Sequence, residues 1–126
     1  MVKRDYRDLV VWQKAMEMVT EIYRITQAFP REEIYGLTSQ IRRAAISIPS
    51  NIAEGQGRLT RGEFRQFLGH AKGSLAELET QILIAQNLGY IQNPSPLLDR
   101  VAAVARLLNG LLNSLATTNR QPTTDN

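Results

Sequence analysis

The chain has 126 residues, no cysteine, and a formal net charge of +3 from 12 Arg and 3 Lys against 12 acidic residues. This length predicts one domain, and the lack of cysteine excludes disulfides, thiolate zinc sites and cysteine nucleophiles. The sequence contains no signal-like or membrane-spanning apolar run, so a cytoplasmic protein without membrane contact is expected.

The first predicted helix begins at about Leu9 and ends at about Ala28. Asp5 or Asp8 is suited to cap its start, and Pro30 ends it because proline holds the preceding residue out of helical geometry. Apolar residues spaced by three and four predict the side that faces the core. They are Leu9, Trp12, Met16, Val19, Tyr23 and Thr26, widened by Ala15, Ile22 and Phe29.

The second predicted helix covers about residues 33–54 and contains a proline. Its core positions are Ile41, Ala44, Ala45, Ile48 and Ile52. Pro49 removes one backbone hydrogen bond, which costs about 3 kcal/mol unless the helix bends. A bend would free the Ala45 carbonyl. The candidate partners for that carbonyl are Ser47, Ser50 and Asn51.

The third predicted helix runs from Thr60 to about Leu88. Before it, Gly55 and Gly57 are expected to adopt the left-handed conformations of a helix C-cap. A phosphate-binding glycine loop is the weaker alternative, since no strand precedes them. Thr60 and Glu63 have the spacing of a capping box. The core positions form a heptad: Phe64, Leu68, Ala71, Leu75, Leu78, Ile82 and Ala85.

The fourth predicted helix follows Gly89, which ends the third, and the NPSP turn at residues 93–96. Its core stripe consists of Leu98, Val101, Ala105, Leu108, Leu112 and Leu115. Residues 117–126 are expected to form a disordered polar tail after a bundle domain at residues 1–116. Four amphipathic helices with short connections predict an all-α, antiparallel up-down-up-down four-helix bundle with a proline in its second helix.

The second and third helices carry further apolar or small residues outside their core stripes. These are Ile46, Pro49 and Ala53 on the second helix, and Gly69, Gly73, Ala76, Thr80, Leu83 and Ile84 on the third. A glycine inside a helix costs up to about 1 kcal/mol relative to alanine, so two of them four residues apart suggest close approach of another helix. We therefore predict a homo-oligomer with these residues at its interface. The alternative is scattered apolar residues on the surface.

The chain lacks the cysteines and paired histidines of many catalytic and metal-binding sites. His70 is the only histidine, so one chain cannot assemble a Ser-His relay or a histidine and cysteine metal site. The carboxylates follow the polar faces of the helices. No enzymatic activity, cofactor or small-molecule substrate is expected.

A basic cluster between the second and third helices is the remaining candidate site. It consists of Arg42, Arg43, Arg58, Arg61, Arg65 and Lys72, of which the last four are predicted to share one edge of the third helix. Arginine suits phosphate geometry, so this edge could follow a nucleic-acid backbone. Alternatively, it forms a charged rim that pairs with Glu54 or Glu79 of a neighbouring subunit.

Three segments resemble one bacterial family. WQKA, FPREEIYGLTSQIRRAAISIPSNIAEGQGR and EFRQFLGHAKGSLAELETQILIAQNLGY, within residues 9–91, are similar to the four-helix-bundle proteins of 23S ribosomal RNA intervening sequences. The resemblance implies a barrel-shaped homopentamer. It also implies kinship with the accessory proteins of diversity-generating retroelements, which associate with reverse transcriptase and RNA through a basic surface.

The residues and the resemblance together lead to one functional expectation. The protein should be a non-enzymatic homopentamer that acts as an accessory protein and binds RNA or an RNA-binding protein. The alternative is an oligomeric protein-protein scaffold with no nucleic-acid contact.

Overall fold

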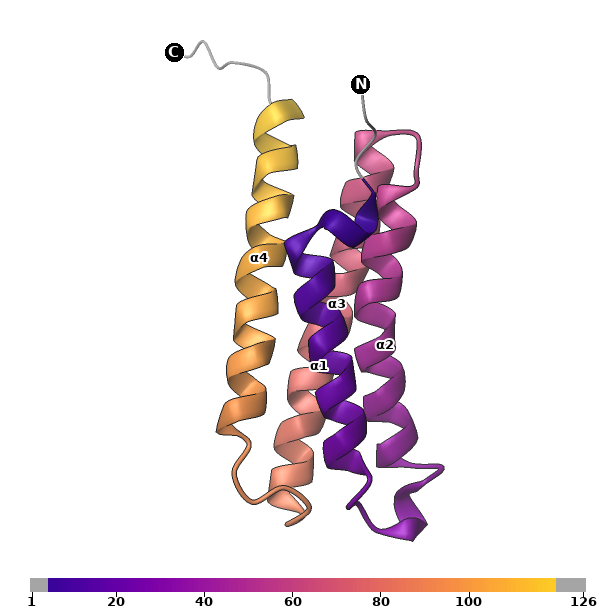
Figure 1. Cartoon of the computed structure of the whole chain (residues 1–126), viewed down its shortest axis with the longest axis vertical. Helices are drawn as coiled ribbons and strands as arrows, with labels where there is room; N and C mark the ends of the chain where they lie inside the picture. The colour runs from indigo at the N-terminus through magenta and orange to yellow at the C-terminus, as the bar shows by residue number, and fades with distance from the viewer. Residues whose placement is uncertain (1–4, 120–126) are drawn as a thin grey trace.

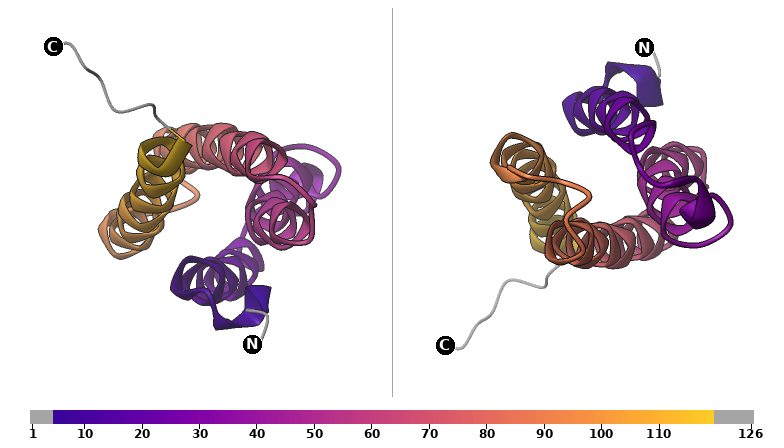
Figure 2. Two further views of the ribbon diagram at one scale, coloured as in Figure 1. Left: turned by 90° about the horizontal axis from the view of Figure 1, so that it is seen from above. Right: turned by 90° about the horizontal axis from the view of Figure 1, so that it is seen from below.

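The computed structural model describes residues 5–119, with side chains described as far as residue 116. It contains α1 (Val10–Thr26), α2 (Leu37–Gln56), α3 (Arg61–Asn87) and α4 (Ser95–Asn119), with short 3-10 helices η1 (Tyr6–Asp8) and η2 (Arg31–Glu33). Consecutive helices run in opposite directions (Figure 1). Viewed along their axes, they lie around one core in chain order (Figure 2), and α4 also contacts α1. The described residues contain no strand, which confirms the predicted all-α four-helix bundle.

The core side of α1 differs in part from the predicted stripe. The buried residues are Val11, Ala15, Met18, Ile22 and Thr26. Trp12 and Val19 are only partly buried, and Met16 is 42% exposed. Successive helical residues are about 100° apart, so two apolar stripes offset by one residue lie side by side on α1. Five of the predicted positions are buried and thus confirmed: Leu9, Ala15, Ile22, Thr26 and Phe29. The other four are partly or largely exposed, because spacing alone cannot decide how far α1 is turned toward the core: Trp12, Met16, Val19 and Tyr23.

The two ends of α1 also differ slightly from the prediction. Asp5 does act as a cap, because its carboxylate accepts a hydrogen bond from the Arg7 backbone N–H at 2.8 Å. The capped element is η1, however, and Leu9 precedes α1 without a side-chain cap. At its other end α1 stops at Thr26, two residues before the predicted Ala28.

The core face of α2 is confirmed, since all five predicted positions are buried. The helix begins at Leu37 rather than near residue 33, because residues 31–33 form η2. Pro49 lies inside the helix and is buried. Asn51 Nδ2 donates to the Ser47 carbonyl at 2.8 Å, so the carbonyl that this side chain satisfies is not the predicted one of Ala45.

The glycines at the end of α2 have a different role from the predicted cap. The helix continues through Gly55 to Gln56, and Gly57 follows with φ −83°, so neither glycine needs a left-handed conformation. Gly55 is buried where α2 meets α3. A Cβ placed there would lie 2.7 Å from the Cβ of Phe67 and 3.0 Å from Cδ1 of Phe64. Close approach of two helices therefore explains Gly55.

The ends of α3 lie close to the predicted ones. Thr60 Oγ1 accepts a hydrogen bond from the Glu63 N–H at 3.1 Å, so Thr60 is the N-cap, but the return bond of the predicted capping box is not formed. Gly89 has φ +83°, and the N–H of Tyr90 donates to the Ala85 carbonyl at 2.9 Å, which is the bonding of a Schellman motif. The predicted heptad is buried apart from Phe64, which is partly exposed.

The fourth helix is longer than predicted. It starts at Ser95, inside the NPSP turn, and buries residues from one stripe: Leu97, Val101, Val104 and Leu108. Of the predicted stripe, Val101 and Leu108 are buried, and the other four positions are partly buried. Residues 117–119 of the predicted tail belong to α4, whereas residues 120–126 lie outside the described part of the chain.

Candidate nucleic-acid interface

The six predicted cationic residues do not form one surface. Two come from α2, one from the connection after it, and three from α3. Arg42 and Arg43 face different seams of the bundle, and Arg58 lies apart from the three cations of α3. The prediction of a single basic cluster is therefore corrected.

Arg42 belongs to the contact between α1 and α2. Its Nε donates to Thr26 Oγ1 at 2.8 Å, and its guanidinium carbon lies 4.5 Å from the centre of the Tyr23 ring. Thr26 in turn donates to the Ile22 carbonyl at 2.7 Å. The half-buried guanidinium thus holds two helices together and is poorly placed for a phosphate.

Arg58 lies across α3 from the other cations of that region. Its guanidinium forms an ion pair with Glu54 at 2.9 Å and stacks over the Phe67 ring at 4.6 Å. Phe67 is two residues after Arg65, which is about 200° around the helix. The predicted shared edge of four cations therefore lacks Arg58.

Arg61, Arg65 and Lys72 do share an edge of α3. Their spacings of four and seven residues place them within about 40° of each other. All three are exposed, and none forms an ion pair with another described residue. This edge is the part of the predicted basic surface that remains available.

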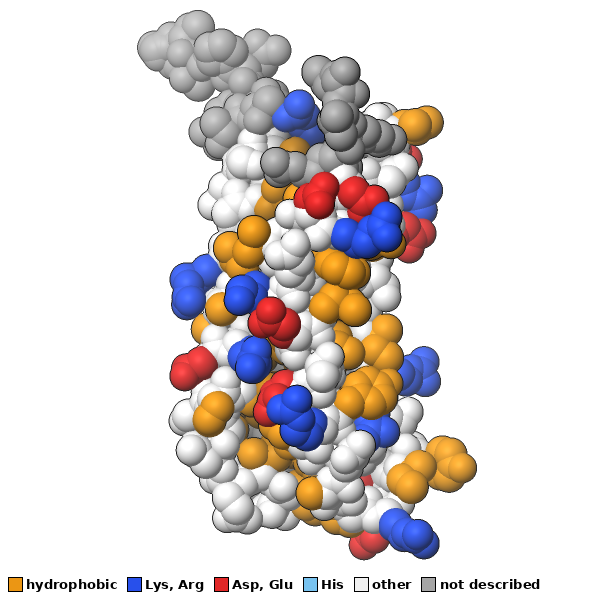
Figure 3. All heavy atoms as spheres, viewed as in Figure 1, with side chains coloured by type: hydrophobic (Ala, Val, Ile, Leu, Met, Phe, Trp, Pro, Cys, Tyr) orange, Lys and Arg blue, Asp and Glu red, His pale blue; other side chains and the backbone are white. Residues whose placement is uncertain are grey.

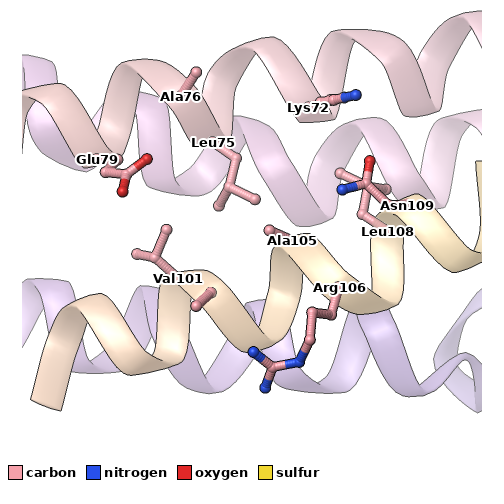
Figure 4. Close-up of a pocket in the computed structure, with 10 residues that line it drawn as sticks. Lys72, Leu75, Ala76, Glu79, Val101, Ala105, Arg106, Leu108 and Asn109 are labelled. Carbon is pink, nitrogen blue, oxygen red and sulfur yellow. The ribbon is translucent and has the colours of Figure 1, made fainter.

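Lys72 also lines a groove of about 360 Å³ between α3 and α4. In Figure 4, side chains from both helices point into this groove, among them Leu75, Val101, Ala105 and Leu108. Arg106 of α4 lines it too and was missed by the sequence analysis. The sequence does not reveal that Arg106 lies near Lys72, because the register between α3 and α4 cannot be inferred from it. Glu79 adds one carboxylate to the lining.

Arg43 faces the seam between α2 and α3. There it lines a groove of about 420 Å³. The other lining residues are Gln40, Ala44, Ser47, Ser74 and Glu77. Arg43 is thus separated both from Arg42 and from the cationic edge of α3.

The predicted interface residues of α3 are all exposed. These are Gly69, Gly73, Ala76, Thr80, Leu83 and Ile84. A Cβ added at Gly69 or Gly73 would meet no atom within 4 Å. Contacts within the chain therefore do not explain why these positions are glycine.

The predicted interface residues of α2 line an apolar groove of about 310 Å³ between α1 and α2. Ile46 is 42% exposed and Ala53 is partly exposed. Pro49 is buried within the chain but also lines this groove, so its place at an interface stays a prediction. The remaining lining residues are Tyr6, Trp12, Met16, Val19 and Ser50. Figure 3 shows hydrophobic side chains along this seam.

The described residues contain neither a candidate metal site nor a candidate membrane span. No three His, Cys, Asp or Glu side chains lie together as a candidate metal site. No described helix has the length and hydrophobicity that a membrane span requires.

His70 is exposed and packs edge-on against the Phe67 ring, with ring centres 5.9 Å apart.

The profile of the 23S rRNA-intervening sequence proteins matches residues 7–110. The chain belongs to this family. Among solved structures it resembles a protein of unknown function from the S23 ribosomal protein family of Bacteroides thetaiotaomicron, with a TM-score of 0.64 and 19% identity over 89% of this chain and 100% of the other. That likeness supports the fold alone. No curated protein matches the chain.

Membership of the 23S rRNA-intervening sequence protein family confirms the resemblance found in the sequence. The match extends beyond the three segments that carried it and includes most of α4. Kinship with retroelement accessory proteins stays a prediction.

Proposed function

We propose that this protein is a non-enzymatic homopentamer that binds RNA or an RNA–protein complex as an accessory protein. The observation that carries the RNA part is the exposed edge of Arg61, Arg65 and Lys72, whose charges no described residue neutralises. Family membership adds support, since the family is named after intervening sequences of ribosomal RNA.

The geometry of this edge suits a phosphate backbone. At 1.5 Å per residue, Arg61 and Arg65 are separated by about 6 Å along α3, and Lys72 follows about 10 Å further on. Arg106 lines the same groove as Lys72 and adds a fourth cation. Several copies in a ring would repeat the edge, and simultaneous binding at linked sites strengthens a weak single contact.

Two surfaces rich in apolar or small residues support the oligomer. One is the groove between α1 and α2, where Met16 and Ile46 are exposed, and the other is the small-residue face of α3 around Gly73. The cores of protein interfaces are depleted in charged residues. Because the two surfaces belong to different helices, a contact between them would be heterologous, and such contacts form a ring when the rotation closes.

The RNA part is tested with a triple variant, Arg61→Gln, Arg65→Gln and Lys72→Gln. Fluorescence anisotropy with a labelled structured RNA should show that affinity falls steeply with salt for the parent protein. The slope of log K against log salt should decrease by about 2–3 in the variant, since each lost phosphate contact removes about 0.7–0.9.

A matched control removes three cations that already have partners within the chain. Lys14 and Arg100 both approach Glu17 at 3.6 Å, and Arg24 pairs with Glu21. The corresponding triple glutamine variant loses the same net charge but should keep the salt slope. An equal loss in both variants would show that only net charge matters and would contradict a defined edge.

A scaffold that binds only protein is the second candidate, and the apolar α1–α2 groove favours it. In that case RNA affinity should be absent or insensitive to salt, whereas oligomer formation persists. The same titration therefore decides between the two candidates.

A further inference from the structure

The polar groove between α2 and α3 lies apart from the cationic edge of α3. It has a volume of about 420 Å³ and is lined by residues of both helices, which is within the range of about 300–1,000 Å³ typical of small-ligand sites. Ser74 and Lys72 are two residues apart on α3 and thus point to different sides of it, about 200° apart. The groove is consequently a separate feature of the surface.

The polar groups at the floor of this groove form hydrogen bonds within the chain. The hydroxyl groups of Ser47 and Ser74 are hydrogen-bonded to each other across the two helices. Asn51 Nδ2 donates to the Ser47 carbonyl at 2.8 Å and to its hydroxyl at 3.2 Å. These bonds fix the floor and leave recognition to the residues at the rims.

Arg43 and Glu77 stand at the rims, on different helices. Both are exposed and line the same groove, yet they form no ion pair with each other or with another described residue. Gln81 is 5% exposed, and its Nε2 donates to Glu77 Oε2 at 3.5 Å. The buried Gln81 Oε1 has no hydrogen-bond partner among the described residues. The groove thus presents guanidinium donors on α2 and a carboxylate acceptor on α3.

We propose that this groove binds a guanine base of single-stranded RNA. The proposal rests on the proposed RNA binding and names the base that this part of the surface recognises. Arg43 donates to the guanine acceptors O6 and N7, as arginine does in base recognition. Glu77 accepts from N1–H and from the N2 amino group.

Guanine fits this pair of side chains better than the other bases do. Its Watson–Crick edge carries two adjacent donors, N1–H and N2–H, which match the two oxygens of one carboxylate. Adenine and cytosine offer a donor beside an acceptor, and uracil has one donor between two acceptors. Each of these would place an acceptor against the Glu77 carboxylate, which leaves that group partly unpaired.

The test uses short uridine-rich RNA strands that differ at one central position, which is guanosine, inosine or adenosine. The full chain should bind the guanosine strand about tenfold more tightly than the adenosine strand. Inosine lacks the N2 amino group and should lose most of that preference. Glu77→Gln and Arg43→Gln should each remove the preference for guanosine.

Glu79→Gln is the matched control, because Glu79 is also on α3 but lines the groove toward α4. This variant should keep the guanosine preference. Circular dichroism and light scattering on all variants verify that fold and oligomer are intact. A changed oligomer in Glu77→Gln would instead identify the groove as a contact between copies and overturn the proposal.

RNA binding and guanine recognition can fail independently of each other. RNA binding with a steep salt dependence but equal affinity for all three strands overturns the guanine site and leaves the RNA function standing. If no RNA binds, the proposed function fails, and guanosine monophosphate becomes the probe in calorimetry. Binding of this nucleotide over adenosine monophosphate, lost in Glu77→Gln, would support the site, whereas absence of that binding overturns it.

Discussion

Two buried threonines show how much depends on one hydroxyl group. Thr26 Oγ1 donates to the Ile22 carbonyl at 2.7 Å and accepts from Arg42 Nε at 2.8 Å. Thr38 is similarly buried, but its Oγ1 has no hydrogen-bond partner among the described residues. A buried polar atom without a partner costs about 1–3 kcal/mol. The same residue type should therefore respond in opposite ways to loss of its hydroxyl.

Thr38→Val and Thr26→Val are nearly isosteric changes, but they should change the free energy of unfolding in opposite directions. Thr38→Val should raise the free energy of unfolding by about 1 kcal/mol, because it removes the unpaired hydroxyl. Thr26→Val should lower it by about 1–3 kcal/mol, because it leaves the Arg42 guanidinium without this acceptor. Urea denaturation measures both, and destabilisation by Thr38→Val would show that its hydroxyl does have a partner.

Glu33 replaces the missing side-chain cap at the start of α2. The N-cap residue is Gly36, and the Glu33 carboxylate instead accepts from the Leu37 N–H at 3.0 Å and from the Tyr90 hydroxyl at 2.9 Å. These bonds, with that to Leu37 the larger cause, hold the pKa of Glu33 below its ordinary value of 4.5. The bond to Glu33 also raises the pKa of Tyr90 above 10.0. One carboxylate thus links α2 to the segment between α3 and α4.

The lowered pKa of Glu33 makes the stability of the fold depend on pH in a definite direction. Its contribution to stability is fully present above the ordinary pKa of 4.5 and is lost as the pH falls through the lower folded value. Glu33→Gln should therefore lower Tm at neutral pH and have little effect at strongly acidic pH. Thermal melts between neutral and acidic pH measure this, and a Tm difference that does not shrink on acidification would refute it.

At the scale of the helices, the contact between α2 and α3 depends on one glycine. The nearest atoms to a Cβ at Gly55 belong to Phe67 and Phe64, and the Phe67 Cβ, at 2.7 Å, is attached directly to the α3 backbone. A rotamer change cannot move that atom away. An additional methyl group would therefore push the two helices apart.

The prediction for Gly55→Ala is a loss of stability. Overpacking costs about 1–3 kcal/mol, which exceeds the gain of up to about 1 kcal/mol from replacing glycine in a helix. Gly110→Ala in α4 is the control, since a Cβ there meets no atom within 4 Å, and it should stabilise. Chemical denaturation of both variants compares them, and equal stabilisation would show that α2 and α3 have room between them.

At the scale of the whole molecule, the exposed glycines of α3 bear on assembly. Gly73→Leu places a bulky side chain on the small-residue face and should disrupt the proposed oligomer while helicity stays. Overpacking costs about 1–3 kcal/mol at each contact, and a symmetric ring repeats that penalty at every contact. Light scattering measures the oligomeric state, and circular dichroism measures the helicity.

Gly110→Leu is the control for assembly, because Gly110 is also exposed but lies on α4 outside the predicted interface. It should leave the oligomer intact. An unchanged oligomer in Gly73→Leu would show that the α3 face is solvent-exposed. Disruption by both variants would point to a general effect on the bundle.

Nearby residues alone predict the helical class, the core faces of α2 and α3, the caps at Thr60 and Gly89, and the family. These features depend on hydrogen bonds and apolar periods within a few residues, so nearby residues are sufficient to predict them. The resemblance rested on the same segments.

Three features become visible only in the packed helices: how α1 is turned toward the core, why Gly55 is glycine, and how the arginines are distributed. Each of these depends on the register between helices that are distant in the sequence. Arg42 is held by a threonine of α1, whereas Arg43, the next residue, faces α3. Adjacent helical residues point about 100° apart, so neighbours in the sequence become parts of different surfaces once the helices pack.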